Sequence, residues 1–585
     1  MQFSKKQLEG AELVFLLVLR IRGRFFRFST KAITVQNSDL DLGPSSLQFS
    51  GGLAEDVSFE ESASPESSLI GQEVAISVLF GDDDGASWGE FAKEDYDLGD
   101  ASAELSLLRK GDNFQMREIL IDGRVESPTY GSRFEPLLFS IVDNFMDRSG
   151  STHRPDQRVT IRTWPTQTSS YPANVHTVVF DETIENRFYP IIIGKPGFAF
   201  AGLNKTEFMG FPLYWVEMNQ ADKHNGNTPA LCLIAGHACT ASNLTVYDLR
   251  NRHEAGSLVG TPYAGNYKQT ASISSVKKDE KGQVVSTCFV IGGVGPTALR
   301  TYKADPLFGS FDQGEGGALE PNTNQTMRGA GAVINFLLRE IPNLILSEKT
   351  GATLNLLDGY HLDFFINEPV DPLDFVTGEI LPLLPLSLLE GPDGVEFIFW
   401  NMDPSDADVV DEINPKTRGG QRASTVTVSS RQNIVNRLAI QFAPEADTGN
   451  YLGHIEYVEE QAASATPESK LIDFDIVGNP YSGASVRRYG VRRGQKITTS
   501  IVQDPATARS ILDWQIRYFG QTKRRASYLM PIEFHHLKIG DIVRWTDDEI
   551  GIKNALSHVV AIRRAPKNCL ISIQTVPNWI GIEQF

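Results

Sequence analysis

The side chains best suited to chemistry in this 585-residue sequence are acidic, and three of them share one turn. Asp82, Asp83 and Asp84 lie between glycines, and grouped carboxylates can hydrolyse glycosides or bind a cation. The turn lacks the acidic ladder and the closing glutamate of an EF-hand loop. Adjacent acids on a glycine-flanked turn are usually a solvated loop, so we expect neither a catalytic nor a metal-binding role for them.

Cysteine and histidine offer a second candidate site. Cys232, His237 and Cys239 occur in "CLIAGHAC", which is not a CxxC pair, and no second matched pair follows. We predict buried small residues in a strand, and a cysteine nucleophile that uses a distant histidine is the alternative. His535 and His536 are adjacent, so on a strand they would point to opposite faces and could not bind one metal together.

Glycine-rich and basic runs complete the candidates. "GGVGPT" from Gly292 and "GEGG" from Gly314 lack the Lys-Ser/Thr of a phosphate loop and the spacing of a dinucleotide fingerprint, so we predict turns. The run "RRYGVRRGQK" from Arg487 interleaves arginine with tyrosine, as nucleic-acid-binding segments do. The net charge of -19 repels phosphate backbones at long range. We therefore expect no catalytic, cofactor-binding or metal-binding residues and no sequence-specific nucleic-acid binding.

The elements that must position these residues are mostly strands. With 41% hydrophobic and 22% charged residues the chain is an ordinary globular one, and its length requires several domains. Fifty glycines and 30 prolines among short β-branched and aromatic runs predict a turn-rich, mainly β architecture. The four cysteines, which include Cys288 and Cys569, are too scattered for a disulfide framework, so we expect reduced thiols.

Charge is concentrated in two blocks. The stretch 39–104 holds 17 acidic residues and only Lys93 as a base, whereas 485–525 holds ten Lys and Arg and two Asp. Such runs are usually solvated surfaces. The sharper hypothesis is that the two blocks face different partners, or each other, in an assembly.

The N-terminal apolar run does not predict a membrane signal. It covers only Leu13 to Leu19, too short to span a bilayer, and arginines follow it, which inverts the order of a secretory signal. The alternation from Leu19 to Phe28 predicts a strand. We expect a protein without a membrane anchor that is made and assembled in a cytoplasm.

Turn signals and helix-end signals divide the chain into four regions. Lys110 to Asn113 predicts a hairpin turn, Val74 to Phe80 a strand, and "TMRGAGAVINFLLREI" a helix that Pro342 ends. The predicted regions are a β domain at 1–165, a β-rich inserted module at 166–325, an α+β module at 326–430 and a C-terminal domain at 431–585.

The best marked element is a helix from Asp504 to Gly520. Asp504 is a cap acceptor, Pro505 suits the first helical position, and Gly520 suits the end. Between them runs one apolar stripe, formed by Ala508, Ile511, Leu512, Ile516 and Phe519. We expect this helix to pack on strands from Asn436 to Phe442 and from Leu537 to Trp545.

The order of motifs in the C-terminal region resembles the hub domain of tail-tip and baseplate proteins of long-tailed bacteriophages. The matching elements are "NRLAIQFA", Ser485 before "RRYGVR", the 504–520 helix, Arg524 with Arg525, and "LKIGDIVRWTD". Near the N-terminus, "MREILIDGRVESPTYGSRFEPLLFSI" is similar to the segment that opens the first hub barrel in lambdoid tail-tip and gene-transfer-agent hub proteins, and "FYPIIIGKPG" resembles another of their segments.

This resemblance implies a structural, non-enzymatic virion protein without cofactors. The implied fold is mainly β with α+β parts: two hub-type β barrels or sheets, at 1–165 and 431–585, with the two modules inserted between them. The implied assembly is a homotrimeric ring at the tail tip of a siphovirus, which closes the tail tube, adapts its symmetry and anchors fibres or receptor-binding proteins. Its neighbours would be a distal tail protein and a tape-measure protein. Viral DNA would pass without specific binding, through a lumen that the acids of 39–104 could line.

Two other functions place activity in the 166–325 module. One is a tail-associated hydrolase of cell wall or polysaccharide, which predicts clearing of purified wall that is lost on substitution of an acid or of His237. The other is an adhesin that binds host glycan, and this role is compatible with the hub.

Overall fold

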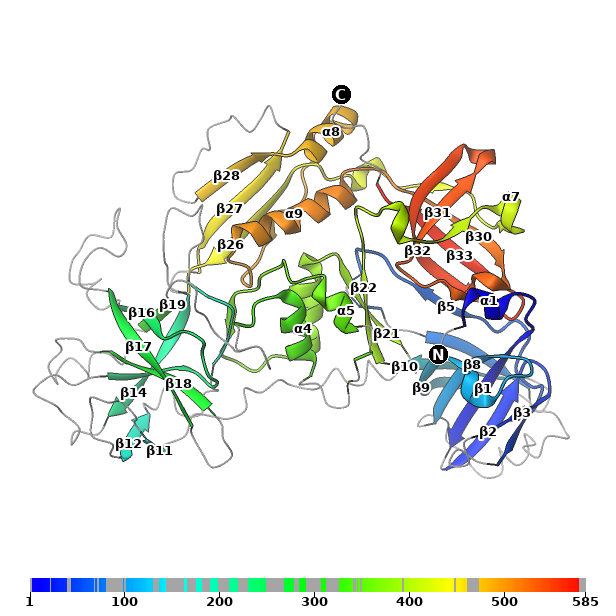
Figure 1. Cartoon of the computed structure of the whole chain (residues 1–585), viewed down its shortest axis with the longest axis horizontal. Helices are drawn as coiled ribbons and strands as arrows, with labels where there is room; N and C mark the ends of the chain where they lie inside the picture. The colour runs from blue at the N-terminus through cyan, green and yellow to red at the C-terminus, as the bar shows by residue number, and fades with distance from the viewer. Residues whose placement is uncertain are drawn as a thin grey trace, which may run out of the picture.

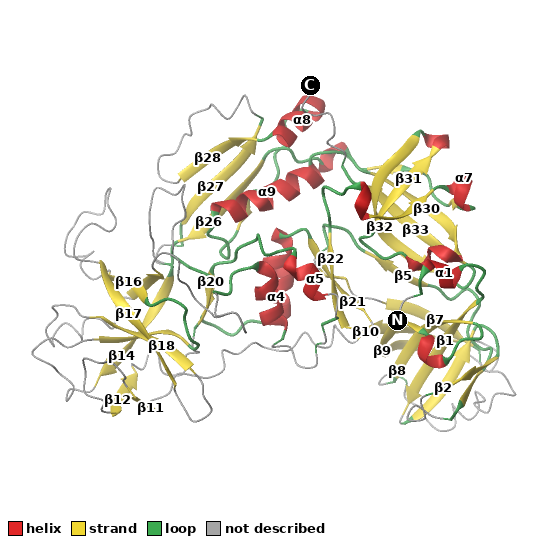
Figure 2. Cartoon of the chain, viewed as in Figure 1, coloured by secondary structure: helices red, strands yellow, loops and turns green. Residues whose placement is uncertain are grey.

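A computed structural model describes most of the chain. The described residues are 3–21, 23–38, 44–67, 69–70, 73–79, 98, 101–129, 136–143, 162–165, 175–180, 190–197, 210–218, 230–248, 268–277, 284–290, 307–311, 326–339, 344, 346–347, 350–391, 394–446, 449–459 and 473–577. Within them the chain is mainly β, in several sheets with a smaller helical part (Figure 2). The predicted fold class, mainly β with α+β parts, is confirmed.

The N-terminal sheet is antiparallel and follows the order β2-β1-β8-β9-β10-β7. Its strands are β1 Leu13–Ile21, β2 Arg24–Ser29, β7 Glu73–Val78, β8 Ser102–Arg109, β9 Glu118–Thr129 and β10 Leu137–Asp143, with α1 Lys5–Leu8 before them and the pair β3 Ile33–Gln36 and β4 Ser46–Phe49 beside them. Both faces of β1 are covered by separate apolar clusters, which explains the unbroken run from Leu13 to Leu19. The predicted hairpin between β8 and β9 is confirmed.

The segment that follows β4 links the two edges of this sheet. Ser29 of β2 donates its backbone N–H to the Ser50 carbonyl (2.7 Å), and Leu79 after β7 donates to Gly52 (2.7 Å). A side chain at Gly52 would meet the Leu79 carbonyl oxygen at 2.1 Å, so this crossing requires glycine. The linked edges give the N-terminal sheet a barrel-like form.

One local prediction is wrong in this region. The alternation from Leu19 to Phe28 is not a single strand, because the chain turns at Gly23, whose φ is +80°. Leu19 then pairs with Phe26 across the β1–β2 hairpin. An alternating pattern that continues through a tight turn cannot be told from one long strand by periodicity alone. In the described part of the chain, no helix is long and apolar enough to cross a membrane.

A second sheet gathers the C-terminal strands and one strand from far away in the sequence. Its order is β23-β31-β32-β33-β30-β24, while β25 pairs with β30 and β5 with β32. The strands are β5 Phe59–Ser62, β23 Val409–Ile413, β24 Gln421–Arg422, β25 Thr427–Val428, β30 Arg524–Pro531, β31 Ile542–Asp547, β32 Ile552–Arg564 and β33 Asn568–Thr575, with α7 Pro415–Arg418 before β24. Because β5 follows directly from the N-terminal sheet, the two sheets lie side by side (Figure 1).

Buried charges also join these two sheets. Arg564 of β32 forms an ion pair with Glu61 of β5 inside the second sheet, and Lys5 of α1, which precedes the N-terminal sheet, forms one with Asp411 of β23 (2.6 Å). Glu118, at the start of β9, is buried near Arg564, and burial raises the pKa of its carboxyl group. Arg564 therefore has one carboxyl group from each sheet beside it, Glu61 and Glu118, and a buried cation of this kind is costly to leave without its counter-charge.

The region predicted as an inserted module contains a closed β barrel, which we call the inserted barrel. Strands β14, β15, β18, β17, β16 and β19 pair in that order, and β19 returns to β14. The bounds are β11 Arg162–Pro165, β12 Val175–Phe180, β14 Phe211–Met218, β15 Ala230–Ala235, β16 Asn243–Asp248, β17 Lys268–Lys277, β18 Val284–Val290 and β19 Leu307–Phe311. Figure 1 shows this barrel at one end of the molecule and the two sheets at the other.

An α/β body lies between the barrel and the two sheets. Its elements are β6 Leu69–Ile70, β13 Ile191–Ile193, α4 Ala330–Leu338, α5 Thr350–Asn355, β20 Phe364–Ile366, α6 Pro372–Phe375, β21 Leu386–Gly391, β22 Gly394–Phe399, β26 Leu438–Pro444, β27 Tyr451–Val458, β28 Asp473–Gly478, α8 Pro480–Tyr489, β29 Ile497–Thr498 and α9 Pro505–Phe519. One apolar core combines side chains from 327–397 and 438–516. This core crosses residue 430, where the sequence suggested a boundary.

The close contact of α4 with α5 depends on Gly331. A Cβ atom there would lie 2.2 Å from the Leu354 carbonyl oxygen, so the helices would have to separate. Gly331→Ala is expected to lower the free energy of unfolding by about 1–3 kcal/mol, because overpacking outweighs the roughly 1 kcal/mol that alanine adds to helix propensity. Urea unfolding measures this. Gly351→Ala in α5 has open space around it and is the matched control, which should be neutral or slightly stabilising.

Two buried histidines make the second sheet sensitive to acid. Burial lowers the pKa of His535 and His558 to about 4. In the unfolded chain the histidine pKa is near 6.5, so between pH 6.5 and about pH 4 each histidine is protonated in the unfolded chain and neutral in the folded chain. Lowering the pH through this window therefore lowers the stability of the fold, whereas stability above it is unaffected. Each histidine contributes roughly 3 kcal/mol to the fall.

His558→Phe tests this pH dependence. The phenyl ring can keep the edge contact with Trp400, whose ring centroid lies 5.3 Å from that of His558. Urea unfolding measured from pH 7 to pH 4 should show a loss of stability smaller by about 3 kcal/mol than in the wild type. An unchanged pH profile would show that His558 is protonated in the folded protein.

Candidate functional site

The motif residues of the C-terminal region meet at Asn436, which lies just before β26 and is fully buried. Its side-chain amide donates to the Ser485 hydroxyl (3.1 Å) and to the Gly490 carbonyl (2.9 Å), and its Oδ1 accepts the Arg492 backbone N–H (2.7 Å). The Ser485 hydroxyl donates in turn to the Gly520 carbonyl at the end of α9. We call this buried network the Asn436 node. It joins the strand, the "YG" turn and the helix that the resemblance arranges in the same order.

Helix α8 places Ser482 and Ser485 at the node, because its capped start fixes its position and its buried face carries these two serines. Asn479 caps it by accepting the backbone N–H groups of Tyr481 (3.0 Å) and Ser482 (3.1 Å), and Pro480 fills the first helical position. The Ser482 hydroxyl donates to the Asn436 carbonyl. The buried face of α8 is therefore small and polar, and it allows a close approach of the helix to β26.

The chain after α8 forms a sharply fixed turn. Gly490 has φ +73°, a conformation that favours glycine. At Gly494 an added Cβ would lie 2.5 Å from a Val435 methyl carbon and 2.8 Å from one of Leu438. The Arg492 backbone carbonyl accepts the backbone N–H groups of Asn436 (2.9 Å) and Arg437 (3.1 Å). The backbone of this turn is thus bound to β26, while its arginine side chains point to solvent.

Helix α9 begins at the predicted cap. The Asp504 side chain accepts the Ala506 N–H (3.0 Å) and contacts His361 Nδ1 (3.0 Å). Burial raises the pKa of Asp504, but the hydrogen bonds from His361 and Ala506 outweigh burial and hold it below its ordinary value. Gly520 ends the helix in a right-handed conformation, φ -72°. The predicted helix and its packing on β26 are confirmed.

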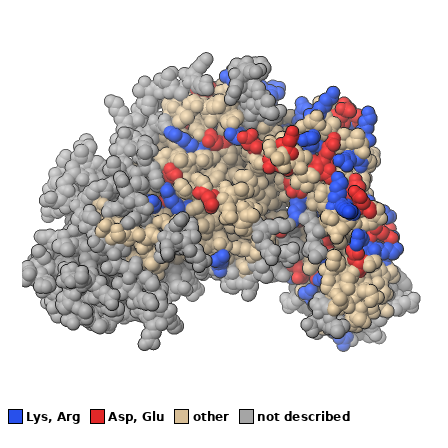
Figure 3. All heavy atoms as spheres, viewed as in Figure 1, with Lys and Arg blue, Asp and Glu red and all other residues tan. Residues whose placement is uncertain are grey.

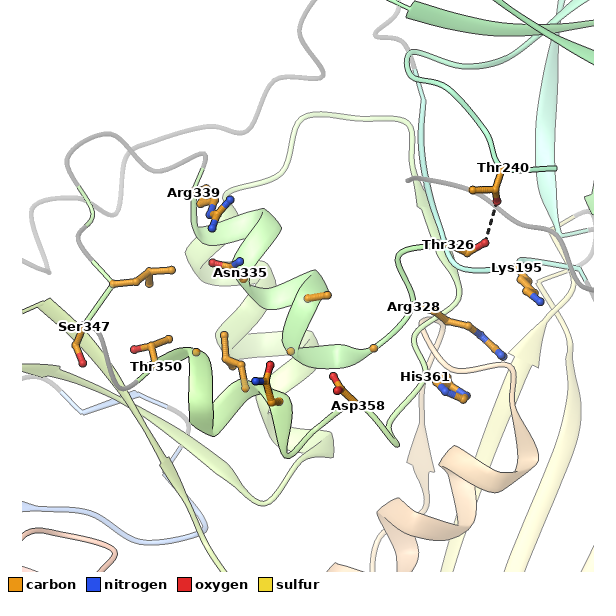
Figure 4. Close-up of a pocket in the computed structure, with 17 residues that line it drawn as sticks. Lys195, Thr240, Thr326, Arg328, Asn335, Arg339, Ser347, Thr350, Asp358 and His361 are labelled. Atoms are coloured by element: carbon orange, nitrogen blue, oxygen red, sulfur yellow. Dashed lines mark hydrogen bonds between the residues drawn. The ribbon is translucent and has the colours of Figure 1, made fainter. Parts of the chain in front are cut away.

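A cleft of about 1030 Å³ lies where the inserted barrel meets α4 and α5 (Figure 4). Lys195, Arg328 and His361 point into it from one side, and Asn335 and Arg339 line it along α4. The hydroxyl groups of Thr240 and Thr326 are 2.8 Å apart and connect the barrel to the chain that leads into α4. The cleft is polar and basic, and its described lining holds no cysteine.

One basic side chain of this cleft, that of Arg328, helps to attach the barrel. Arg328 binds the fully buried Asp363 through two bonds of 2.8 and 2.9 Å, and Asp363 also accepts the Lys195 backbone N–H (2.7 Å). Gly194 donates its N–H to the Met327 carbonyl (2.9 Å). The chain therefore enters and leaves the barrel through two adjacent segments that one buried ion pair fixes to the α/β body.

The candidates named from the sequence are spread over the molecule. Cys232 is buried in β15, as predicted, and Cys239 is half-buried in the loop after it. The His237 ring, in the loop after β15, accepts the Ile192 N–H of β13 (3.0 Å) and so links the barrel to that strand. Burial lowers the pKa of His237. Asp82 to Asp84, Gly292 and Gly314 lie outside the described residues. Among the described residues, no group of three His, Cys, Asp or Glu side chains is placed to hold a metal.

His535 and His536 lie in a 3-10 turn, Ile532–His536, and not on a strand. His535 Nε2 contacts the Asn568 carbonyl oxygen (3.0 Å), whereas His536 lies 3.4 Å from Asp411. The two rings thus have different surroundings and act as packing groups. Sequence reasoning missed the Asn436 node and the Asp363 ion pair. For the node, the Asn479-Pro480 pair was a usable signal, since it marks a helix start just as Asp504-Pro505 does.

Neither a family model nor a curated protein matches the sequence. Solved structures align with it over nearly its whole length. A 43 kDa tail protein of prophage MuSo2 from Shewanella oneidensis aligns at TM-score 0.31 and 9% identity, over 96% of this chain and 98% of that one. A tail protein from Neisseria meningitidis gives TM-score 0.32, 8% identity and 96% of each chain. The prophage tail protein gp18 from Listeria monocytogenes aligns at TM-score 0.31 and 8% identity, over 95% of this chain and 97% of that one. The chain is thus weakly similar to phage tail proteins, the class that its motif order resembles.

Proposed function

We propose that the chain is a structural component of a phage tail tip. In this proposal it forms a homotrimeric hub that closes the tail tube, adapts its symmetry and anchors fibres or receptor-binding proteins for host attachment and DNA delivery. Its partners are a distal tail protein and a tape-measure protein, it assembles in the host cytoplasm, and DNA passes it without specific binding. It performs no catalysis and needs no cofactor.

The observation that carries the proposal is the Asn436 node. The resemblance rests on an Asn-bearing strand, a "YG" turn and a capped helix, which are separate strings in the sequence. In the structure, Asn436 binds the Gly490 carbonyl directly and is linked to the Gly520 carbonyl through the Ser485 hydroxyl. The strings therefore describe a single structural unit, and that unit is built for rigidity: its polar groups bind one another and the backbone.

The pairing of the two sheets supports a ring-forming role. The sheet of β1 to β10 and the sheet of β30 to β33 lie beside each other in one chain: the N-terminal part supplies strand β5 to the second sheet, and Glu118 of β9 is buried near Arg564 of β32. Two sheet domains per chain give six in a trimer, so a trimer could present six-fold contacts on one side and three-fold contacts on the other. We propose that these two sheets are the hub-type domains named at 1–165 and 431–585.

Deletion of the gene from the phage that encodes this chain tests the role. Lysates should contain filled heads without functional tails, because without the hub the tail tube lacks the structure at its tip from which it would assemble. Supplying the wild-type chain from a plasmid should restore plaque formation. Normal infectious particles in the absence of the chain would contradict the proposal.

A second role, host binding, is favoured by the placement of the inserted barrel. The barrel has an apolar core of its own and lies at the end of the molecule away from the two sheets (Figure 1). Because Gly194 and Met327 are hydrogen-bonded, a short glycine linker can replace residues 198–325 and leave the body closed. Labelled wild-type chain should adsorb to host cells and the linker variant should not. Equal adsorption would remove this role.

A further inference from the structure

A groove of about 760 Å³ lies where the α/β body meets the two sheets. Its lining comes from α5 and β22 of the α/β body, from β5 and β23 of the second sheet, and from the start of β9 in the N-terminal sheet (Figure 1). Three parts of the fold thus form the walls of one groove. We call it the β22 groove.

The groove follows the outer edge of β22. This strand pairs with β21 on one side, and its four consecutive residues 396–399 all line the groove. Because side chains alternate between the two faces of a strand, a lining by four residues in a row indicates the edge of the strand and not one of its faces. Near the start of this edge, the Val395 carbonyl accepts the Ser347 N–H (3.0 Å).

Phe397 and Phe399 leave backbone groups open at this edge. Trp400, just after β22, donates its N–H to the Pro385 carbonyl (2.9 Å), so even-numbered residues of the strand bond toward β21 and odd-numbered ones point away from it. The described residues form no hydrogen bond with the outward N–H and C=O groups of Phe397 and Phe399. An unpaired strand edge of this kind is a template for a further strand.

Exposed apolar side chains lie along the same groove. Leu356, just after α5, is 59% exposed, and Val410 of β23 is 50% exposed. Both line the groove together with Ile398 and Phe399. Exposed apolar groups that gather in one groove commonly mark a binding site. A strand added at β22 would cover such groups with every second side chain.

The charged side chains of the lining are mainly acidic. Against Lys538 and Arg564 stand five carboxyl groups, those of Glu61, Glu118, Glu396, Asp408 and Asp541. On the face drawn in Figure 3, basic and acidic atoms are interspersed over the part of the molecule that holds β30 to β33. The excess of carboxyl groups is therefore a local property of the groove, and it favours a basic partner.

Two buried polar atoms of the lining lack a hydrogen-bond partner among the described residues. They are Glu118 Oε2 and Arg564 Nε, and the residues that carry them are only 8% and 4% exposed. Burial raises the pKa of Glu118, so a cation beside it would stabilise its charged form. Glu118 requires a donor and Arg564 an acceptor. A peptide segment supplies both, through a basic side chain and a backbone carbonyl.

We propose that the β22 groove binds an extended segment of another tail protein. The segment adds as a strand to β22 at Phe397 and Phe399, covers Leu356 and Val410 with apolar side chains, and places a Lys or Arg side chain beside Glu118. The net charge of -19 favours a different, more basic protein over a second copy of this chain. In naming a tail protein as the partner, the inference rests on the proposed function.

An array of short synthetic peptides tests the groove with known probes. The peptides overlap and cover the other proteins encoded by the tail genes of the same phage, together with this chain itself. Labelled full-length chain is applied to the array. We expect the bound peptides to combine β-branched residues with at least one Lys or Arg. An array without bound peptides would overturn the inference. So would binding to peptides of this chain alone, which would make a second copy the occupant.

Fluorescence anisotropy with the tightest-binding peptide then locates the site. Leu356→Ser combined with Val410→Ser should weaken binding about tenfold, because the peptide loses its apolar contacts in the groove. The matched control is Val428→Ser combined with Leu529→Ser, which changes side chains that are 58% and 37% exposed elsewhere and should leave binding unchanged. Circular dichroism confirms that the variants fold. Equal binding by the two double variants would overturn the inference.

Two further measurements test the ion pair and the strand addition. Glu118→Gln should weaken binding about tenfold, and norleucine in place of the basic peptide residue should weaken binding to the wild type but not to Glu118→Gln. N-methylation of every second backbone N–H of the peptide should abolish binding in one of the two frames only, because alternate residues face β22. Additive effects of the two charge changes, or equal effects in both frames, would contradict this mode of binding.

These outcomes are distinct from those that test the proposed function. A chain found at the tail tip that binds no tail peptide would overturn the inference and leave the proposed function intact. A chain absent from the tail tip would remove the proposed function, and the tail protein as partner, even where a peptide binds in the groove.

Discussion

Asn436→Ala is expected to lower the free energy of unfolding by about 3–5 kcal/mol, the largest effect of any single substitution considered for this chain. The change removes three hydrogen bonds, to Ser485, Gly490 and Arg492. It also takes these bonds from three partner groups, of which the Ser485 hydroxyl belongs to a buried residue, and a buried group left without its bond costs about 1–3 kcal/mol. Urea unfolding followed by circular dichroism measures the effect.

The control for this substitution is Asn433→Ala. Asn433 lies three residues earlier and is exposed, so its loss should change stability by less than about 0.5 kcal/mol. The turn at 487–496 contains four arginines and should become a preferred site of trypsin cleavage in Asn436→Ala and not in Asn433→Ala, because the node holds that turn against β26. Equal stability of the two variants would show that the node does not fix this part of the fold.

Asp363→Asn is expected to cost about 3 kcal/mol and to loosen the inserted barrel. The carboxylate is fully buried and neutralises Arg328, whose side chain is only 15% exposed, so the substitution leaves a buried cation without its counter-charge. Because Asp363 also binds the Lys195 N–H, the two segments that lead into and out of the barrel should both be affected. Limited proteolysis should cut near 195–197 and 326–328 faster than in the wild type.

A double-mutant cycle separates the ion pair from other effects of this substitution. Arg328→Met in the Asp363→Asn background removes the cation that has lost the Asp363 carboxylate, so the double variant should be less destabilised than the sum of the single variants. Asp374→Asn, on the exposed first turn of α6, is the control and should be near neutral. Strict additivity of the two changes at positions 328 and 363 would contradict the role given to the pair.

Helix starts show what the sequence could and could not predict. Asp504 with Pro505 and an apolar stripe predicted α9 within a residue at each end. Asn479 with Pro480 marks the start of α8 in the same way, yet α8 was missed. Its buried face is formed by Ser482, Gly483 and Ser485, so it has no hydrophobic period to detect. Patterns of apolar residues cannot reveal a helix that packs through small polar ones.

Contacts between segments that are far apart in the sequence were the other feature that could not be predicted. Nothing in residues 59–62 indicates that they pair with β32, about 500 positions later, because register between distant strands is set by the whole fold. Asp363 and Arg328 are likewise ordinary charged residues in the sequence, and they form a buried pair only when residues 328–329 pair with residues 361–362. The mainly β class, by contrast, followed directly from short apolar runs and frequent turns.

The location of the chain in virions tests the central claim most directly. Intact particles of the phage that encodes it should be labelled with an antibody against the purified chain and viewed by electron microscopy. The account predicts label at the distal end of the tail and nowhere else on the particle. Label on the head, label along the tube, or particles that lack the chain altogether would contradict it.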